Sequence, residues 1–337
     1  MAESWRNRKT LILGRTDMIG LLTPAEYNDC VEHAFRMHGL GRAYMEPKGH
    51  IVLDRYRGEW EVMPSWIEEP EAAACKWVSI REGNAAYDLP AVFSILVYTH
   101  PETGFPLAIC DGSHHTLMRT GASAAVSAKW LARRDSSVLA ILGAGSVGKG
   151  ALATCNEVFP WREVRIWSRT RQSLDRFLGE EQPAYPHLEL KPTTDVEQAV
   201  RGADVIVTGT HARRFLVDDA WVSPGTHIAA LGADLAGEQE LDPRTLRRAR
   251  IFVDDIRQCR EDGEINVALR EGLISEADVA GEIGKVICGE LEGRRSDDEI
   301  TVFDSTGIAL QDSATVPLEY ERALAAGVGI EKKMIST

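Results

Sequence analysis

Short apolar, β-branched runs alternate with helical stretches in the second half of the chain. The runs lie at 138–142, 164–167, 204–209, 226–231, 250–255 and 301–305. This alternation is typical of βαβ units, in which parallel strands form a sheet that helices cover on both faces. The sequence therefore predicts an α/β region with a parallel sheet beyond residue 137.

The pattern before residue 137 is mixed and begins with a well-marked helix. Thr23 is a predicted N-cap, Pro24 occupies the first helical position, and Glu26 completes a capping box, so the helix should end at Gly39 or Gly41. Strand-like stretches follow at 50–54, 60–63, 75–80 and 90–98. These elements favour an α+β domain. The segment 307–329 predicts a final helix that could return to pack on this first domain.

Length and composition suggest two domains and a full hydrophobic core, because the chain has 337 residues, 44% of them apolar. The longest apolar run, 89–98, is much shorter than the ~20 residues that span a membrane, and the N-terminal residues lack the order of a signal peptide. We therefore expect a cytoplasmic protein that does not enter a membrane.

The charge and the cysteines exclude further classes of function. A formal net charge of −13 would repel a phosphate backbone, and the basic run at 244–250 is short, which argues against nucleic acid as a partner. The cysteines are scattered, with no close pair and no neighbouring histidine, so we expect buried thiols and neither a disulfide framework nor a metal site. They are Cys30, Cys75, Cys110, Cys155, Cys259 and Cys288.

The first run of the parallel sheet is followed by a glycine motif. Gly143, Gly145 and Gly148 have the G-x-G-x-x-G spacing between this strand and a helix-compatible stretch. In such motifs the first glycine allows a tight turn, the second lets a pyrophosphate approach the backbone, and the third lets helix and strand pack closely. The context predicts a dinucleotide site, and a tight turn without a cofactor is the alternative.

The residues after the second run bear on the choice of cofactor. A carboxylate at the end of this strand would hold the ribose 2′-hydroxyl of NAD, but the sequence there is Ser168-Arg169-Thr170. A hydroxyl and a guanidinium suit a 2′-phosphate, which favours NADP. The alternative is that Arg169 is a surface residue without cofactor contact.

Two charged residues are candidates for chemistry. Lys76 lies between Cys75 and Trp77 in a strand-like run, where an unpaired ammonium would be costly, so we expect an anion beside it unless it faces solvent. Asp234 follows the run at 226–231, and ligands bind at the carboxyl ends of parallel strands. Asp242 is the better cap for the next helix, which leaves Asp234 free for chemistry.

A neighbouring pair of histidines, His114 and His115, lies just before Arg119. A neutral imidazole there could relay a proton near pH 7, but we expect a turn or interface role for both side chains.

Motifs along nearly the whole chain form a specific set: MEPKGHI, VMPSW, CKWVS, PETGFPLAICDG, MRTGASAAVSAKWLARRDSS, GAGSVG, GTHIAALGADLAGEQELD and ITVFDSTGIALQD. By these motifs the chain resembles the ornithine cyclodeaminase/mu-crystallin family, and within it the archaeal-type alanine dehydrogenases and related imine reductases. The resemblance implies a Rossmann-type doubly wound parallel sheet plus a mixed α+β domain. It also implies a homodimer whose active site lies in the cleft between the domains.

The resemblance assigns domains and substrate contacts. It implies a substrate-binding and dimerisation domain at 1–125, joined by a C-terminal helix at 311–337, and an NAD(P)-binding domain at 126–310. Substrate-binding residues are expected at Lys48, Glu61, Lys76 and Arg119, with Asp234 and Lys76 as catalytic residues. A guanidinium and an ammonium would hold the carboxylate of an amino or imino acid, while Asp234 exchanges a proton at its nitrogen.

The same resemblance implies a set of cofactor contacts along the glycine turn and at the following strand ends. These are Arg119, Thr120, Gly143, Ala144, Gly145, Ser146, Val147, Gly148, Ser168, Arg169, Thr170, Thr208, Thr210, Leu231, Gly232 and Ser305.

Three functions remain open within this family. We favour an NAD(P)-dependent amino-acid dehydrogenase or imine reductase, because lysine at Lys48 resembles the alanine dehydrogenases. Glu61 resembles the ornithine cyclodeaminases, which release ammonia and recycle NAD. These enzymes favour an acidic residue that contacts the ribose, however, and this chain has Ser168 at that position. The third alternative is an NADP-retaining ligand-binding protein of the mu-crystallin type, against which the intact Lys76, Arg119 and Asp234 argue.

Overall fold

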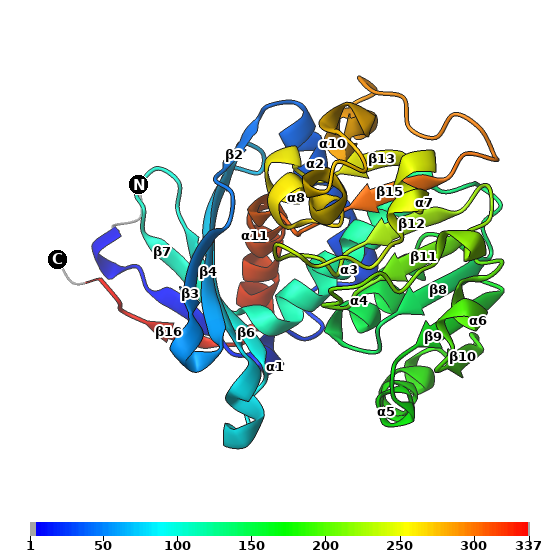
Figure 1. The fold of residues 1–337 in the computed structure, drawn as a ribbon. Helices are drawn as coiled ribbons and strands as arrows, with labels where there is room; N and C mark the ends of the chain where they lie inside the picture. The colour runs from blue at the N-terminus through cyan, green and yellow to red at the C-terminus, as the bar shows by residue number, and fades with distance from the viewer. Residues whose placement is uncertain (1–4, 336–337) are drawn as a thin grey trace.

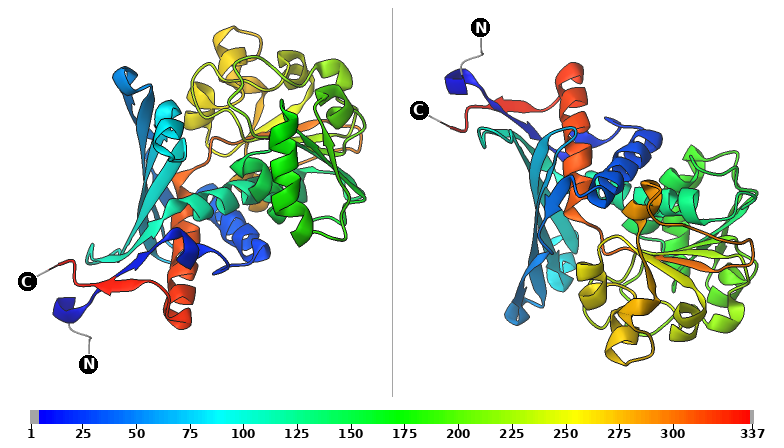
Figure 2. Two further views of the ribbon diagram at one scale, coloured as in Figure 1. Left: turned by 90° about the horizontal axis from the view of Figure 1, so that it is seen from below. Right: turned by 90° about the horizontal axis from the view of Figure 1, so that it is seen from above.

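Two eight-stranded sheets form the frame of the molecule in the computed structural model, which describes residues 5–335. Figure 1 shows the sheets at opposite sides, with α2, α3 and α11 between them. The two views in Figure 2 show the same arrangement from below and above, with both ends of the chain on the side of the first sheet.

The second sheet is entirely parallel, in the order β10-β9-β8-β11-β12-β15-β13-β14. The prediction of a doubly wound parallel sheet is confirmed, including all six predicted strands. β10 and β14 were not predicted, because these edge strands are short and contain a proline and a glycine. The bounds are β8 (Val138–Leu142), β9 (Glu163–Trp167), β10 (Leu190–Thr193), β11 (Val205–Thr208), β12 (His227–Ala230), β13 (Arg250–Val253), β14 (Val279–Glu282) and β15 (Thr301–Asp304).

Both faces of this sheet are buried. In β8, Leu139 and Ile141 belong to one hydrophobic cluster, whereas Val138, Ala140 and Leu142 belong to another. Side chains that alternate along a strand point to opposite faces, so each cluster covers one face. The surrounding helices are α4 (Ser146–Cys155), α5 (Arg171–Glu181), α6 (Val196–Val200), α7 (Pro243–Arg248), α8 (Ile256–Asp262), α9 (Asn266–Arg270) and α10 (Ile283–Ile287).

The first sheet is mixed, in the order β16-β1-β7-β6-β5-β4-β2, with β3 also paired to β4. β1 and β7 are parallel, and the other neighbours are antiparallel. The four predicted strands are confirmed as β3 to β6, while β4 and β5 extend further than expected. The bounds are β1 (Thr10–Leu13), β2 (Ala43–Met45), β3 (Gly49–Leu53), β4 (Gly58–Ile67), β5 (Ala72–Arg81), β6 (Val92–Thr99), β7 (Pro106–Asp111) and β16 (Ile330–Lys332).

The predicted first helix is confirmed as α2 (Pro24–Gly39). The Glu26 amide donates to Oγ1 of Thr23 at 3.3 Å, and the Thr23 amide donates to Oε2 of Glu26 at 2.8 Å, which completes the capping box. The remaining helices are α1 (Arg15–Met18), α3 (Gly112–Leu131) and α11 (Ala309–Ala326). Short 3-10 turns lie at Trp5–Asn7, Asp54–Tyr56, Glu82–Tyr87, Gln182–Ala184, Asp219–Trp221 and Glu276–Asp278.

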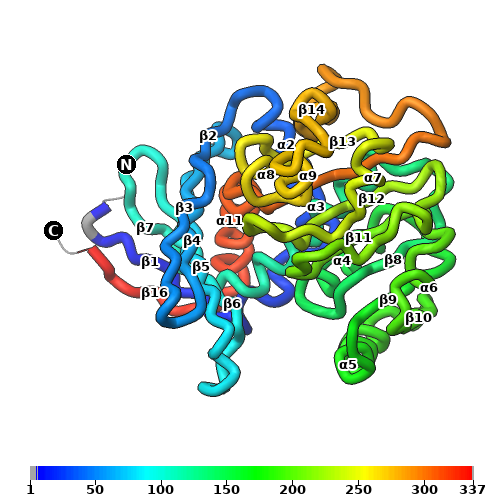
Figure 3. The backbone as a smooth tube through the Cα atoms, viewed as in Figure 1, coloured from blue at the N-terminus to red at the C-terminus, as the bar shows by residue number. Residues whose placement is uncertain are grey.

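The C-terminal prediction needs a correction. A helix over 311–337 was expected, but α11 ends at Ala326, because Gly327 adopts a positive φ of 67° that stops the helix. The chain then forms β16, which pairs antiparallel with β1 (Figure 3). Residues 336–337 of the predicted helix lie outside the described residues. The expected packing of this helix on the first sheet is confirmed by its contacts with β4 and β5.

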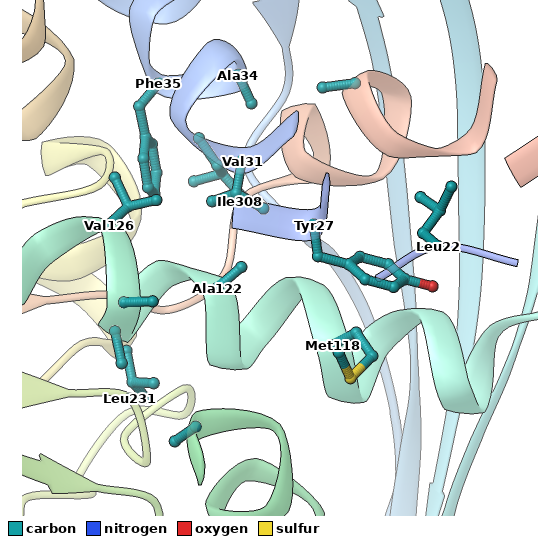
Figure 4. Close-up of a cluster of buried hydrophobic side chains, with 14 of the residues drawn as sticks. Leu22, Tyr27, Val31, Ala34, Phe35, Met118, Ala122, Val126, Leu231 and Ile308 are labelled. Carbon is teal, nitrogen blue, oxygen red and sulfur yellow. The ribbon is translucent and has the colours of Figure 1, made fainter. Parts of the chain in front are cut away.

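The helix α3 connects the two sheets, so the expected domain boundary between residues 125 and 126 falls inside a helix. Figure 4 shows Met118, Ala122 and Val126 of α3 in one buried cluster with Tyr27 and Val31 of α2. α3 also packs backbone to backbone on α4.

A pair of glycines allows this close approach of α3 to α4. A Cβ at Gly121 would lie 2.1 Å from the carbonyl carbon of Gly150, and one at Gly150 would lie 2.1 Å from the carbonyl oxygen of Leu117. The position of α3, and of the side chains it carries, is therefore tied to the parallel sheet. Across residues 5–335, no helix is long and apolar enough to cross a membrane.

Candidate active site

The glycine turn connects β8 to the N-terminus of α4. A Cβ at Gly148 would lie 2.0 Å from the carbonyl oxygen of Gly143, and Gly143 itself has a φ of +133°. A Cβ at Gly145, in contrast, would meet no described atom within 4 Å. Packing thus requires the outer two glycines, whereas Gly145 leaves free space before the helix N-terminus. This arrangement fits the pyrophosphate of a dinucleotide.

The other expected cofactor contacts gather at one edge of the parallel sheet. Thr208 ends β11, Ser305 follows β15, and Ser168 follows β9. Leu231 and Gly232 follow β12. The sheet order reverses between β8 and β11, which opens a crevice at the carboxyl ends of the strands. The sequence-predicted residues therefore surround the place where open α/β sheets bind ligands.

Three of the expected cofactor contacts, Thr210, Ser305 and Gly232, lie against carboxylates of neighbouring residues. Both the amide and Oγ1 of Thr210 donate to Oε1 of Glu240, at 2.8 and 2.7 Å. Oγ of Ser305 donates to Oδ2 of Asp254 at 2.8 Å. A Cβ at Gly232 would lie 2.2 Å from Oε2 of Glu240. These side chains shape the ends of the strands, where the backbone can face a ligand.

The three residues after β9, Ser168, Arg169 and Thr170, have different surroundings. Thr170 caps α5, where its Oγ1 accepts from the Ser173 amide at 3.3 Å. Ser168 is half-buried and Arg169 is exposed. The guanidinium is thus free to swing toward a bound group, while the Thr170 hydroxyl is committed to the helix.

A buried charge cluster lies between the first sheet and α11. Lys76 is fully buried, and its Nζ donates to Oδ1 of Asp312 at 3.0 Å. Nε of Arg119 lies 3.3 Å from the same oxygen, and a terminal nitrogen of Arg119 donates to Gln311 at 2.9 Å. Of the two alternatives for Lys76, a solvated face is wrong and a buried ammonium beside an anion is confirmed; the anion is Asp312.

The pKa values of Lys76 and Asp312 are both lowered, but for different reasons. Burial and the nearby charge of Arg119 lower the pKa of Lys76 to about 8, although Asp312 opposes this. The pKa of Asp312 falls below its usual value, because the charges of Lys76 and Arg119 and the bond to His115 outweigh its burial. The cluster therefore holds a stable carboxylate beside an ammonium that loses its proton readily.

A second group of charges brings the two sheets together. Nζ of Lys48 lies 4.0 Å from Oε2 of Glu61 and 3.9 Å from Oδ2 of Asp234. Lys48 and Glu61 are buried at the first sheet, whereas Asp234 follows β12 of the second. Burial opposes the charge on Lys48, but Glu61 and Asp234 outweigh it and raise its pKa. Three residues that were predicted separately thus converge.

Glu61 and Lys76 also share a face of the first sheet. Lys76 pairs with Met63, and Glu61 pairs with Val78, so both side chains point to the side covered by α11. The charge of Arg119 acts on both Lys48 and Lys76. The three cations expected to bind substrate, Lys48, Lys76 and Arg119, therefore lie in one region. Thr120, next to Arg119 on α3, is half-buried.

Sequence reasoning missed the acids of α11. Asp312 and Glu319 are both buried and lie seven residues apart, which places them on one face of the helix. That seven-residue spacing, which places two acids on one helical face, was a signal that could have found them. His115, expected in a turn or interface, lies on α3 and contacts both carboxylates.

Two residues beside Asp234 were also missed. Nδ1 of His211 lies 3.8 Å from Oδ1 of Asp234 and 3.7 Å from Oε2 of Glu238. The carboxylate of Glu238, followed by that of Asp234, raises the pKa of His211 to about 9, and the imidazole itself is exposed. No sequence spacing signals this contact, because His211 and Asp234 follow different strands.

The segment Asp262–Asn266 supports the loop that carries Asp234. Glu264 accepts from the amides of Glu240 and Leu241, at 2.9 and 2.7 Å. The Asn266 amide group donates to the carbonyl of Glu238 at 2.9 Å, and its oxygen accepts from the Gly237 amide at 2.9 Å. These bonds fix the part of the loop that follows Asp234.

Comparison with known proteins places this chain in a family. The family model described as "Ornithine cyclodeaminase/mu-crystallin family" matches residues 8–327. The chain belongs to this family. Alanine dehydrogenase of Archaeoglobus fulgidus is 40% identical over 325 residues, which cover 96% of this chain and 98% of that protein. The expected family membership is confirmed.

Solved structures confirm the expected fold. An archaeal alanine dehydrogenase dimer with bound NAD superposes with a TM-score of 0.91 at 39% identity, covering 97% of this chain and 100% of the other. A Δ1-pyrroline-2-carboxylate reductase of Thermococcus litoralis, in complex with NADH and L-proline, also gives 0.91 at 32% identity, covering 95% and 99%. These relatives are oxidoreductases of amino and imino acids.

Proposed function

We propose that the protein is an NAD(P)-dependent amino-acid dehydrogenase or imine reductase, which interconverts a small α-imino or oxo acid and an α-amino acid. The observation that carries this proposal is the convergence of Lys48, Glu61 and Asp234 next to the Lys76–Arg119 cluster. In this arrangement the cations Lys76 and Arg119, which can bind a carboxylate, lie near Asp234, which can exchange a proton. The family membership and the glycine turn support a nicotinamide cofactor at the adjoining strand ends.

The residues of this chain divide the work by their chemistry. Arg119 and Lys76 bind the substrate carboxylate and fix the orientation of Cα, since a guanidinium and an ammonium can together hold both oxygens. Asp234 donates or accepts a proton at the substrate nitrogen, and Lys48 holds this carboxylate in place. A nicotinamide dinucleotide, held by its pyrophosphate at the glycine turn, would supply or accept the hydride at Cα. Burial of Lys48 and Glu61 limits water around the imine.

The preferred cofactor in this proposal is NADP. Ser168 and Arg169 follow β9, where a carboxylate would otherwise contact a ribose hydroxyl, and the exposed Arg169 can reach outward. A guanidinium favours the 2′-phosphate by charge-assisted hydrogen bonds. The solved relatives contain NAD or NADH, and titration of this protein with both cofactors tests the preference.

The proposal includes a homodimer formed through the first sheet. The face of this sheet turned away from α11 exposes Trp77 by 42% and Ile95 by 48%, although both residues are large and apolar. Such a face is typical of a surface that a second subunit covers. The archaeal alanine dehydrogenase that this chain resembles is a dimer.

One observation favours a second candidate, an ornithine cyclodeaminase. Oε1 of Glu61 is buried, and within the described part of the chain no group hydrogen-bonds to it. A free carboxylate oxygen in the cleft could accept a hydrogen bond from a second amine of the substrate. In that reaction the distal amine would attack the imine, ammonia would leave, and the cofactor would be regenerated.

A panel of assays distinguishes the candidates. NADPH or NADH is incubated with oxo acids plus ammonia or methylamine, and in parallel ornithine and lysine are tested for ammonia release. We expect stoichiometric consumption of the reduced cofactor with an oxo acid. Ammonia release with only catalytic cofactor would establish the cyclodeaminase. Tight cofactor binding without turnover of any substrate would establish the ligand-binding alternative.

A further inference from the structure

We propose that His115 and Glu319 form a buried ion pair that positions Asp312, and through it the two cations that bind the substrate carboxylate. The inference rests on the proposed function, because that function assigns Lys76 and Arg119 to the carboxylate. His115 and Glu319 are positioning residues, since they act on the substrate only through Asp312.

The geometry forms a chain of contacts between three helices. His115 lies on α3, and its Nδ1 is 2.7 Å from Oε2 of Glu319, while its Nε2 is 3.0 Å from Oδ1 of Asp312. The hydroxyl of Tyr27, on α2, donates to the other oxygen of Glu319 at 2.7 Å. All four side chains are buried. The imidazole therefore bridges the two acids of α11.

These contacts determine the protonation state of His115. Both ring nitrogens face carboxylate oxygens, which only accept hydrogen bonds, so both nitrogens must carry a proton. Burial opposes this charge, but Glu319 and the bonds to both acids raise the pKa of His115 to about 9. Lys76 from β5 and Arg119 from α3 approach the same oxygen of Asp312, and their charges oppose that of the imidazolium.

Asp312 competes with the substrate carboxylate for Lys76 and Arg119. Its Oδ1 is contacted by Lys76 at 3.0 Å, His115 at 3.0 Å and Arg119 at 3.3 Å. Because His115 donates one of these bonds permanently, Asp312 holds the other two cations less tightly. Lysine has three donors and arginine five, so both keep donors for a second anion.

The charges in this cluster do not cancel. Lys76, Arg119 and His115 are cationic, whereas Asp312 and Glu319 are anionic, so one positive charge remains among the five groups. A substrate carboxylate would neutralise it. Loss of His115 alone would remove this excess and leave Glu319 as a buried anion, which disfavours binding of a further anion.

Three variants test the proposal: His115→Leu, Glu319→Leu and the double variant. We expect His115→Leu to raise KM for the oxo acid more than tenfold with a smaller change in kcat. The double variant removes both charges of the pair, so it should recover thermal stability relative to the single variants. Its KM should nevertheless stay about tenfold above that of the wild type, as expected for loss of one charge-assisted hydrogen bond to Asp312.

The double variant carries the test even if a single variant fails to fold. Purely structural roles for His115 and Glu319 predict that KM returns to the wild-type value along with stability, and this result would overturn the proposal. His114→Gln is the matched control, because His114 precedes His115 on α3 and has no hydrogen bond to the acids of α11 within residues 5–335. We expect its KM to equal that of the wild type.

A second measurement does not depend on activity. Imidazole ¹⁵N resonances of the unliganded protein, with His115 assigned by its loss in His115→Leu, should show both ring nitrogens protonated at pH 7.5. A neutral His115 at this pH would overturn the inference while leaving the proposed function intact. Conversely, a protonated His115 in a protein that turns over no oxo acid would support the ion pair and refute the proposed function.

Discussion

Nζ of Lys48 lies 3.9 Å from Oδ2 of Asp234, although the lysine precedes a strand of the first sheet and the aspartate follows a strand of the second. This contact connects the two sheets at the candidate active site. It also places the proposed acid–base group beside a buried cation, where its carboxylate has a defined position. The assignment of Asp234 to proton transfer depends on this arrangement.

Replacement of the carboxylate tests that assignment. We expect Asp234→Asn to keep the fold and the affinity for the dinucleotide but to lower kcat by ~10² or more, because the amide cannot exchange the proton. Steady-state kinetics and cofactor fluorescence measure the two effects. Asp297→Asn, which alters an exposed carboxylate, is the control. Near-normal turnover by Asp234→Asn would refute the mechanism for a dehydrogenase and for a cyclodeaminase alike.

Substrate binding should depend on pH through Lys76. Burial and the charge of Arg119 lower the pKa of this lysine to about 8, so it is cationic below that pH and neutral above it. Because the substrate carboxylate needs the cation, KM should rise as the pH increases through about 8. Lys76→Ala should raise KM at every pH and abolish this dependence on pH, while the affinity for the dinucleotide changes little. An unchanged pH profile in Lys76→Ala would show that another group titrates.

Two glycines of the same turn should respond differently to an added methyl group. Gly145→Ala places its Cβ in free space, so we expect a stable protein that binds the dinucleotide at least tenfold more weakly, since the methyl group occupies the pyrophosphate position. Gly148→Ala forces its Cβ to within 2.0 Å of the Gly143 carbonyl, so it should lower Tm by several degrees. Thermal denaturation with and without cofactor measures both. Equal loss of stability in the two variants would contradict the assignment.

The parts of the fold that follow from local pattern could be predicted from the sequence. The capping box at Thr23 and Glu26 and the glycine turn depend on residues close in the chain, and the strands of the parallel sheet are continuous apolar runs. The strand β16 could not be predicted, because its three residues are exposed and pair only with β1, at the other end of the chain.

The candidate site shows the same limit. Lys48, Glu61, Lys76, Arg119 and Asp234 could be named from motifs, but the contacts that each of them makes could not. Asp312 meets Lys76 only because α11 packs against the first sheet, and that packing depends on contacts far apart in the sequence. Buried charge clusters of this kind depend on tertiary structure, so a sequence gives the residue types and seldom the pairs.

Cofactor affinities test the proposed role of Arg169 in the segment after β9. If Arg169 contacts the 2′-phosphate, the wild type should bind NADP more tightly than NAD by ~1–3 kcal/mol. Arg169→Ala should then lose most of this difference, with the affinity for NAD almost unchanged. Fluorescence titration of both cofactors gives the four dissociation constants. Equal or tighter binding of NAD by the wild type would reduce Arg169 to a surface residue.

The last prediction concerns the exposed face of the first sheet. Trp77 and Ile95 are cross-strand neighbours, and Trp60 packs against Trp77 at a tilt, with ring centroids 5.8 Å apart, so this face has a broad apolar centre. A charge placed there would be desolvated in a dimer but solvated in a monomer. We therefore expect Ile95→Asp to dissociate the protein. Light scattering at micromolar concentration should give twice 37.2 kDa for the wild type and about 37.2 kDa for the variant.

Phe215→Asp, which changes an exposed aromatic residue beyond β11 of the other sheet, is the control and should leave the dimeric mass unchanged. A wild type of monomeric mass would refute the dimer, and a dimeric Ile95→Asp would move the interface to another surface.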